Sequence, residues 1–146
     1  MVTRARDAGP LAREVEHTAD LGLEVEAPTL AVLFERAGLA MLGLMIDLAA
    51  VDPRERVALA VEADDAEALL RDWLQVLLVR LAGDGLAVSE LAVEDVSERA
   101  VRGWGAGERV DPARHRFYTE IKGVSYHQIA VRRTAAGWWA RVILDV

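Results

Sequence analysis

The sequence predicts an α+β fold, built as a single two-layer domain in which a mixed or antiparallel β-sheet is covered by two amphipathic helices. Three observations lead to this prediction. The expected strands come in clusters instead of alternating strictly with helices. Two stretches carry apolar residues at helical spacing. The chain has 146 residues, of which 53% are hydrophobic and 28% charged, which is enough for one buried core.

The chain begins with a polar segment, so we expect residues 1–10 to form a flexible tail and residues 11–146 to form the folded domain. From Leu21 to Glu26 apolar and polar residues alternate, which predicts a strand with one face in solvent. Thr29 is expected to cap the helix that follows. The apolar positions of this helix are Leu30, Leu33, Phe34, Ala37, Met41, Leu44, Met45 and Leu48.

A second strand and a second helix are expected in the middle of the chain. Alternation over 57–61 predicts a strand with one wet face. Asp64, followed three residues later by Glu67, has the pattern of a capping box and predicts a helix start. Gly83 is placed to end this helix. Its apolar positions are Leu69, Leu70, Trp73, Leu74, Leu77 and Leu81.

The remainder of the chain is predicted to form strands joined by turns. Residues 135–137 predict a hairpin turn between the last two strands, and residues 105–116 predict the longest loop. Trp138 and Trp139 must point to opposite faces of their strand, one into the core and the other toward a helix, a partner or water. The expected strands cover 86–96, 99–104, 120–124, 126–133 and 138–146.

The charge balance is acidic, because 24 Asp and Glu residues face 17 Lys and Arg residues and give a formal charge of −7. This argues against binding bare nucleic acid over a broad surface, although a small basic patch stays compatible with it. The absence of cysteine excludes disulfides, thiolate zinc sites and cysteine nucleophiles. With no transmembrane-length apolar run and no signal peptide, we expect a cytoplasmic protein without membrane contacts. An exposed tryptophan face would suit a homo-oligomer.

Acidic groups near the two ends of the chain are the first candidates for chemistry. Asp20 closes a polar run that contains His17, and Asp145 stands beside Val146, whose α-carboxylate adds a second negative group. Such groups repel each other unless a cation lies among them. Oxygen ligands of this kind suit calcium or magnesium better than zinc. The residues alone leave open whether the two ends meet, and a strand-end turn in which Asp20 accepts backbone N–H bonds is the simpler role for this residue.

A second polar cluster runs over residues 120–127. Gly123 would allow a close approach of backbone beside Lys122. In a strand, Ser125 and His127 would share a face, as a nucleophile and its base require, but no nucleophile-elbow motif surrounds the serine. The three histidines of the chain are not spaced as zinc ligands; they are His17, His115 and His127.

Several short motifs occur in order along nearly the whole chain from Glu14 to Val146. They are His17-Thr18-Ala19-Asp20, Ala27-Pro28-Thr29-Leu30, Leu33-Phe34-Glu35-Arg36-Ala37, Ala40-Met41, Met45-x-Asp47, Leu69-Leu70-x-Asp72-Trp73-Leu74, Gly107-Glu108 with His115, Ile121-Lys122-Gly123-Val124-Ser125-Tyr126-His127 and Val142-Ile143-Leu144-Asp145-Val146. Together they resemble the archease family, with no large insertion. The family pattern usually has Thr where Ser125 stands and commonly Ala at Gly123.

The resemblance implies a partner of the RtcB-type RNA ligase, which acts in tRNA splicing and RNA repair and joins cyclic-phosphate or 3′-phosphate RNA ends to 5′-hydroxyl ends. It implies that the protein is not itself an enzyme but promotes guanylylation and multiple turnover of the ligase. It also implies a calcium or magnesium site whose ligands are Asp20, Asp145 and the Val146 carboxylate. The residues expected to contact the partner are Lys122, His17, Tyr126 and His127.

Two other functions stay open on the sequence. A stand-alone metal-dependent phosphoester hydrolase would turn over a small phosphoester without any ligase, although no clear general base stands beside the acids. A general chaperone or interaction module would have no role for a metal and would not bind calcium at millimolar concentration.

Overall fold

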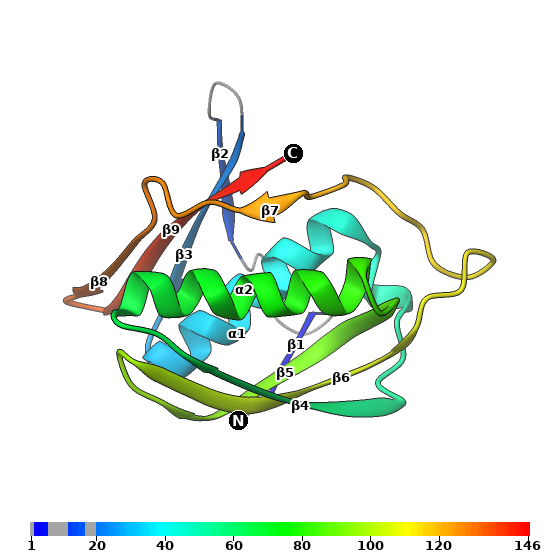
Figure 1. The fold of residues 1–146 in the computed structure, drawn as a ribbon, viewed down its shortest axis with the longest axis horizontal. Helices are drawn as coiled ribbons and strands as arrows, with labels where there is room; N and C mark the ends of the chain where they lie inside the picture. Colours follow the sequence, from blue (N-terminus) through cyan, green and yellow to red (C-terminus); the bar gives the residue numbers. More distant parts are fainter. Residues whose placement is uncertain (1, 6–11, 17–19) are drawn as a thin grey trace.

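The computed structural model describes residues 2–5, 12–16 and 20–146, and its strands form two antiparallel sheets with two helices between them (Figure 1). Sheet A has the strand order β1-β5-β6-β4. Sheet B has the order β2-β3-β9-β7, and β8 also pairs with β9. The α+β class, the antiparallel pairing and the two helices are confirmed. The strands, however, are divided between two sheets, whereas one was expected.

The helices and strands have the following bounds, given first for each sheet and then for the helices. The strands of sheet A are β1 (Thr3–Arg4), β4 (Glu55–Glu62), β5 (Leu86–Val96) and β6 (Ala100–Arg109). The strands of sheet B are β2 (Arg13–Glu16), β3 (Leu21–Ala27), β7 (Gly123–Val124), β8 (Ala130–Thr134) and β9 (Gly137–Asp145). The helices are α1 (Leu30–Met45), the short 3-10 helix η2 (Leu48–Ala50) and α2 (Ala66–Ala82).

The helix ends follow local capping chemistry. Thr29 caps α1 as predicted, because its hydroxyl accepts a hydrogen bond from the backbone N–H of Val32 at 3.2 Å. The predicted cap of α2 is wrong by one residue: Asp65, not Asp64, accepts from the N–H of Ala68 at 2.8 Å. Gly83 ends α2 as predicted. Neither helix in the described part of the chain is long and apolar enough to cross a membrane.

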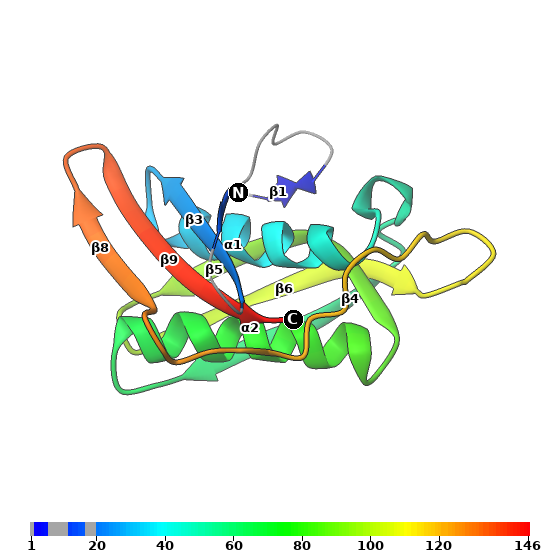
Figure 2. The same cartoon turned by 90° about the horizontal axis from the view of Figure 1, so that it is seen from above.

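Both helices contact both sheets, so the core lies in two connected layers. Figure 2 shows the strands of sheet B running diagonally across α1 and α2, while sheet A covers their other side. The centre of the core is Trp73 of α2, which is fully buried beside Phe34 of α1 with ring centroids 6.2 Å apart. The indole Nε1 of Trp73 donates a hydrogen bond to the carbonyl oxygen of Phe34 at 3.1 Å, which satisfies its polar atom.

Sheet A bends around the helices at two β-bulges in β5. The pairing with β6 skips Ser89 and Glu94, and each skipped residue follows a residue that pairs with a glycine of β6, Gly107 or Gly103. A Cβ at either glycine would overlap a carbonyl oxygen of β5. The buried carboxylate of Glu35 in α1 accepts the N–H of Val93 at 2.8 Å, which satisfies backbone beside the second bulge.

Three predictions for the chain ends and turns need correction. Residues 1–10 were expected to be a tail, but Thr3–Arg4 forms β1 and pairs with β5. The expected loop 105–116 starts later, because β6 continues to Arg109. The expected strand 126–133 is shorter, since only β8 is extended; its hairpin link to β9 is confirmed. Trp138 packs against the core and Trp139 does not, as predicted.

Candidate functional site

The pairing of β3 with β9 brings the two predicted acidic residues to one end of sheet B. The register ends with Leu21 opposite Leu144. Asp20 directly precedes Leu21 and Asp145 directly follows Leu144, so both acids lie at the same end of this strand pair. Leu144 is buried in the core, and because side chains alternate along a strand, Asp145 points to the outer face. Its side chain is exposed, whereas Asp20 is half-buried.

On the other side of β9, the short strand β7 places Lys122 beside Asp145. Gly123 pairs with Asp145, and the backbone N–H of Lys122 donates to the carbonyl oxygen of Asp145 at 2.7 Å. Val146 follows Asp145 and is 41% exposed. Along the main chain, the exposed Asp145 therefore lies between Asp20, which precedes β3, and Lys122, which precedes β7. Figure 1 shows this end of β9 lying beside β7.

The segment that leads to Lys122 is held by backbone hydrogen bonds to the C-terminal end of α1. The N–H of Asp47 donates to the carbonyl oxygen of Arg116 at 3.0 Å. The N–H groups of Tyr118 and Thr119 donate to the carbonyl oxygens of Met45 and Leu44 at 2.9 and 3.1 Å. Lys122 is therefore positioned by the main chain.

Tyr126 is engaged with α2. Its hydroxyl donates to a carboxylate oxygen of Asp72 at 2.9 Å, and this bond raises the pKa of Tyr126 above its ordinary value. The guanidinium of Arg71 lies over the Tyr126 ring at 4.3 Å and donates to the carbonyl oxygen of Val124 at 2.8 Å. Arg71 and Asp72 thus tie β7 to α2. The sequence placed Asp72 in a motif, but nothing in it pointed to this contact.

Two further predictions concern the turn after β7 and the segment before β3. The prediction that Ser125 and His127 share a strand face is wrong. They lie in a turn after β7, in which the N–H of His127 donates to the hydroxyl of Ser125 at 2.9 Å. The exposed His127 is therefore not presented beside a nucleophile. The predicted contact residue His17 lies outside the described residues.

As a metal site, the described residues at this end of sheet B offer the carboxylate oxygens of Asp20 and Asp145. Among the residues that the structure describes, no group of three or more His, Cys, Asp or Glu side chains is arranged to hold a metal ion. Asp20 and Asp145 supply two carboxylates, and the α-carboxylate of Val146 would be the third donor. This donor chemistry fits a hard cation that completes its coordination with water.

Comparisons with known proteins show the family to which this chain belongs. A model of the Archease protein family matches residues 13–146. The chain belongs to the archease family. The archease of Methanopyrus kandleri is 39% identical over 136 residues, covering 91% of this chain and 97% of that protein. The archease of Methanosarcina mazei is 35% identical, with 90% and 93% covered.

Solved structures show that the archease fold is the one described above. Protein 1598 of Methanobacterium thermoautotrophicum superposes with a TM-score of 0.76 at 27% identity, covering 92% of this chain and 98% of that one. A Thermotoga maritima archease, described as a possible chaperone, has a TM-score of 0.65 at 18% identity, with 92% and 96% covered. The second likeness supports the fold alone.

A second charged cluster surrounds Glu108, which lies in one of the motifs of the archease resemblance. Its carboxylate is buried and accepts the N–H of Asp52, and the guanidinium of Arg114 donates to it at 2.7 Å. His115 is also buried; its Nδ1 accepts the N–H of Asp111 at 2.8 Å, and its Nε2 lies 3.6 Å from Glu108. The cluster closes the loop after β6 onto the chain around η2.

The Glu108 ion pair predicts a pH dependence of folding. The hydrogen bonds from Arg114 and from the N–H of Asp52 lower the pKa of Glu108 to about 2. A depressed carboxylate pKa stabilises the fold above the unfolded pKa, and this stabilisation is lost as the pH falls from about 4.5 toward 2. Urea unfolding should therefore show a stability difference between wild type and Glu108→Gln that narrows over this range. A constant difference from pH 7 to pH 3 would contradict the assignment.

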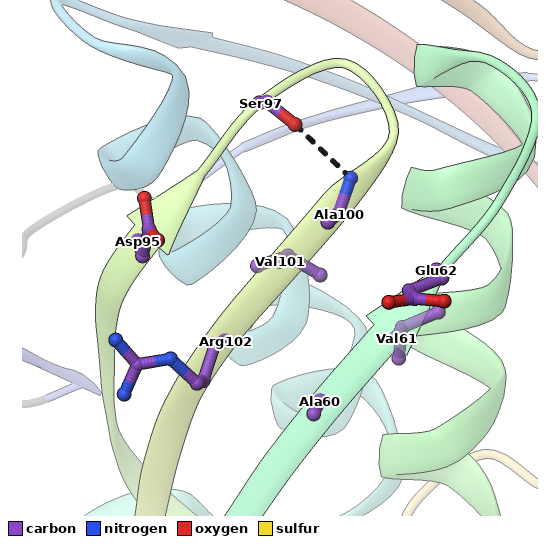
Figure 3. A pocket seen from close by; sticks show the side chains of 8 residues that line it. All are labelled: Ala60, Val61, Glu62, Asp95, Ser97, Ala100, Val101 and Arg102. Atoms are coloured by element: carbon purple, nitrogen blue, oxygen red, sulfur yellow. Dashed lines mark hydrogen bonds between the residues drawn. The ribbon is translucent and has the colours of Figure 1, made fainter.

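A hollow elsewhere on the surface does not belong to the candidate site. It has a volume of about 600 Å³ and lies at the turn between β5 and β6 and the adjacent end of β4. Figure 3 shows its polar side chains, Glu62, Asp95, Ser97 and Arg102, with the hydroxyl of Ser97 accepting the N–H of Ala100. None of the predicted site residues lines it.

Proposed function

We propose that this archease activates an RNA ligase of the RtcB type, promoting ligase guanylylation and multiple turnover without catalysing a reaction of its own. Membership of the family supports the proposal. The single observation that carries it is the position of Asp145 at the end of β9. This strand lies between β3, which follows Asp20, and β7, which follows Lys122. An acid pair next to a lysine offers contacts of both signs to a nucleotide-binding site.

The acidic end of sheet B is proposed to hold calcium or magnesium. Asp20, Asp145 and the carboxylate of Val146 would be the ligands, as the oxygen-only donor set favours. When bound, a divalent ion would neutralise charge on phosphate oxygens during nucleotidyl transfer. The chain's own part is to hold the two acids at fixed positions through the β3–β9 pairing. Lys122 would contact a phosphate or an acidic residue of the ligase.

The decisive experiment is single-turnover guanylylation of a candidate ligase with and without the protein. Faster formation of the ligase–guanylate adduct is expected when the protein is present. The protein alone should not turn over a small phosphoester. If it did so at a rate dependent on added metal, the hydrolase alternative would replace the activator. If the ligase rate were unchanged, a general interaction module would be the better description.

Metal binding has its own expected result. Calorimetric titration should show that wild type binds Ca²⁺ at millimolar concentration or below, and that Asp145→Ala does not. The matched control is Glu98→Ala, which removes an equal charge from the exposed turn between β5 and β6. Binding by Asp145→Ala as tight as by wild type would place the ion elsewhere, and no binding by wild type would remove the metal from the proposal.

A further inference from the structure

One segment of this acidic protein is basic. Residues 121–144 contain no Asp or Glu, yet they include Lys122, Arg132, Arg133 and Arg141. The segment therefore carries a formal charge of +4 in a chain whose total is −7, which leaves −11 for the remainder. Because β8 and β9 occupy the second half of this segment, three of these positive charges lie on one hairpin of sheet B.

Two of the arginines lie beside a tryptophan on the outer face of sheet B. Arg132 of β8 pairs directly with Trp139 of β9, and Arg141 is two residues farther along β9, so the three side chains share a face. Their guanidinium carbons lie 5.5 and 5.9 Å from the centre of the Trp139 ring. This face points away from the helices, because Trp139 lies outside the core whereas Ala140 is inside it. We call these three residues the arginine–tryptophan patch.

Two acids of β3 share the face of the patch without binding its arginines: Glu24 lies opposite Arg141, and Glu26 lies opposite Trp139. No ion pair between described residues involves Arg132 or Arg141. Among the described residues, the Arg141 side chain donates to one backbone carbonyl oxygen, that of Gln128, at 2.9 Å. Glu24, which lies opposite Arg141, is bound by Arg13. Arg132 is exposed, and Trp139 and Arg141 are half-buried, so the patch is accessible and ordered by its strands.

We propose that the arginine–tryptophan patch binds single-stranded nucleic acid, with a base stacked on Trp139 and neighbouring phosphates bound by Arg132 and Arg141. An aromatic ring flanked by guanidinium groups is the arrangement with which proteins hold unpaired bases and their backbone. An acidic peptide would use the two charges but would leave the indole without a function. A duplex would keep its bases stacked and out of reach.

The position of the patch defines a path for the bound nucleic acid over the protein surface. Trp139 and Asp145 lie six residues apart on β9, which is about 20 Å along an extended strand. A few nucleotides bound at the patch would span this distance along the outer face of sheet B. The inference does not depend on the proposed ligase activation, since it rests on the surface of this chain alone.

The test uses fluorescence anisotropy with a labelled oligouridylate of about 12 nucleotides. Binding is compared at about 0.15 M salt, where the Debye length is about 8 Å and charges farther than this from the patch are largely screened. Trp139→Ala should weaken binding roughly tenfold, the effect of losing one stacked base. Arg132→Ala should weaken binding and make the slope of log K against log salt less negative by about 0.7, the value for one lost phosphate contact on a single strand. Unchanged melting temperatures would show that the variants are folded.

Arg133→Ala is the matched control. Arg133 neighbours Arg132 on β8, carries the same charge and lies at the same 5.5 Å from a tryptophan ring, that of Trp138, but on the opposite face of the strand. Its replacement should leave the slope unchanged. Equal effects of Arg132→Ala and Arg133→Ala would show that only net charge matters and would overturn the patch. Binding of a duplex as tight as that of the single strand would also overturn the patch. So would polyglutamate binding that is unchanged in Trp139→Ala, because this result would indicate an acidic protein as the partner.

Discussion

Replacing Asp145 with alanine is expected to abolish activation of a cognate ligase while leaving the protein folded. The carboxylate is exposed, and the sheet uses only the backbone of this residue, which pairs with Gly123 and accepts the N–H of Lys122. Removing one preorganised charged group from a site that stabilises developing charge costs about 100-fold or more in rate. The stimulated guanylylation rate should therefore fall to that of the ligase alone. Asp20→Ala is expected to have the same effect.

The control for this loss is again Glu98→Ala, which changes the net charge equally at the far turn of sheet A. It should activate the ligase as well as wild type does. Circular dichroism and thermal melting should be unchanged for all three variants. If Asp20→Ala or Asp145→Ala activated the ligase at the wild-type rate, the acidic end of sheet B would not be the functional site.

Replacing Trp73 with alanine is expected to produce the largest loss of stability. Its side chain is fully buried between the sheets, packs against Phe34 and satisfies its own N–H on the carbonyl oxygen of that residue. Emptying a site of this size costs about 3–5 kcal/mol, because the lost transfer free energy is joined by the cost of the cavity. Because the free energy of unfolding of a domain is about 5–15 kcal/mol, this loss is a large share of the total. Urea unfolding followed by circular dichroism measures it.

Val79→Ala is the matched control on the same helix, because Val79 is 51% exposed. Its change in unfolding free energy should stay within about 0.5 kcal/mol. Trp73→Phe separates the two contributions of the indole, since it keeps most of the packing and removes the hydrogen bond. A Trp73→Ala loss no larger than that of Val79→Ala would mean that the core is not centred on this residue.

The sequence predicted the two helices well, but not that they lie between two sheets. Thr29 and Gly83 mark helix ends by chemistry that is local, and both were correct. Helix α1 also carries apolar residues outside the expected stripe, such as Val32, Leu39 and Leu42, and all three are buried. A helix that is apolar on most sides is covered on most sides. This signal for a second sheet was present in the sequence.

The residues of the candidate site are predictions from the sequence, and only part of their geometry could be predicted with them. Strands around Leu23 and Val142 are evident from alternation, but their pairing register is a property of the folded chain, so the sequence alone could not bring Asp20 to Asp145. The resemblance to the archease family supplied that expectation. β1 has two residues, too few for any period to be detected. The hydrogen bond from Tyr126 to Asp72 joins residues 54 positions apart, which no local sequence pattern can predict.

The bulges of β5 limit how this chain can vary. Where each one bends the strand, the carbonyl oxygen of Ala87 or Ala92 occupies the space of a side chain on β6, so only hydrogen fits on the α-carbon of Gly107 and Gly103. Deleting Ser89 would straighten the strand and leave the later residues paired as before, because Val88 and Leu91 face the core on either side of the bulge. The curvature of sheet A thus depends on pairs of positions, each with an extra residue on β5 and a glycine on β6. While the bulges are present, neither glycine can be replaced by a residue with a side chain.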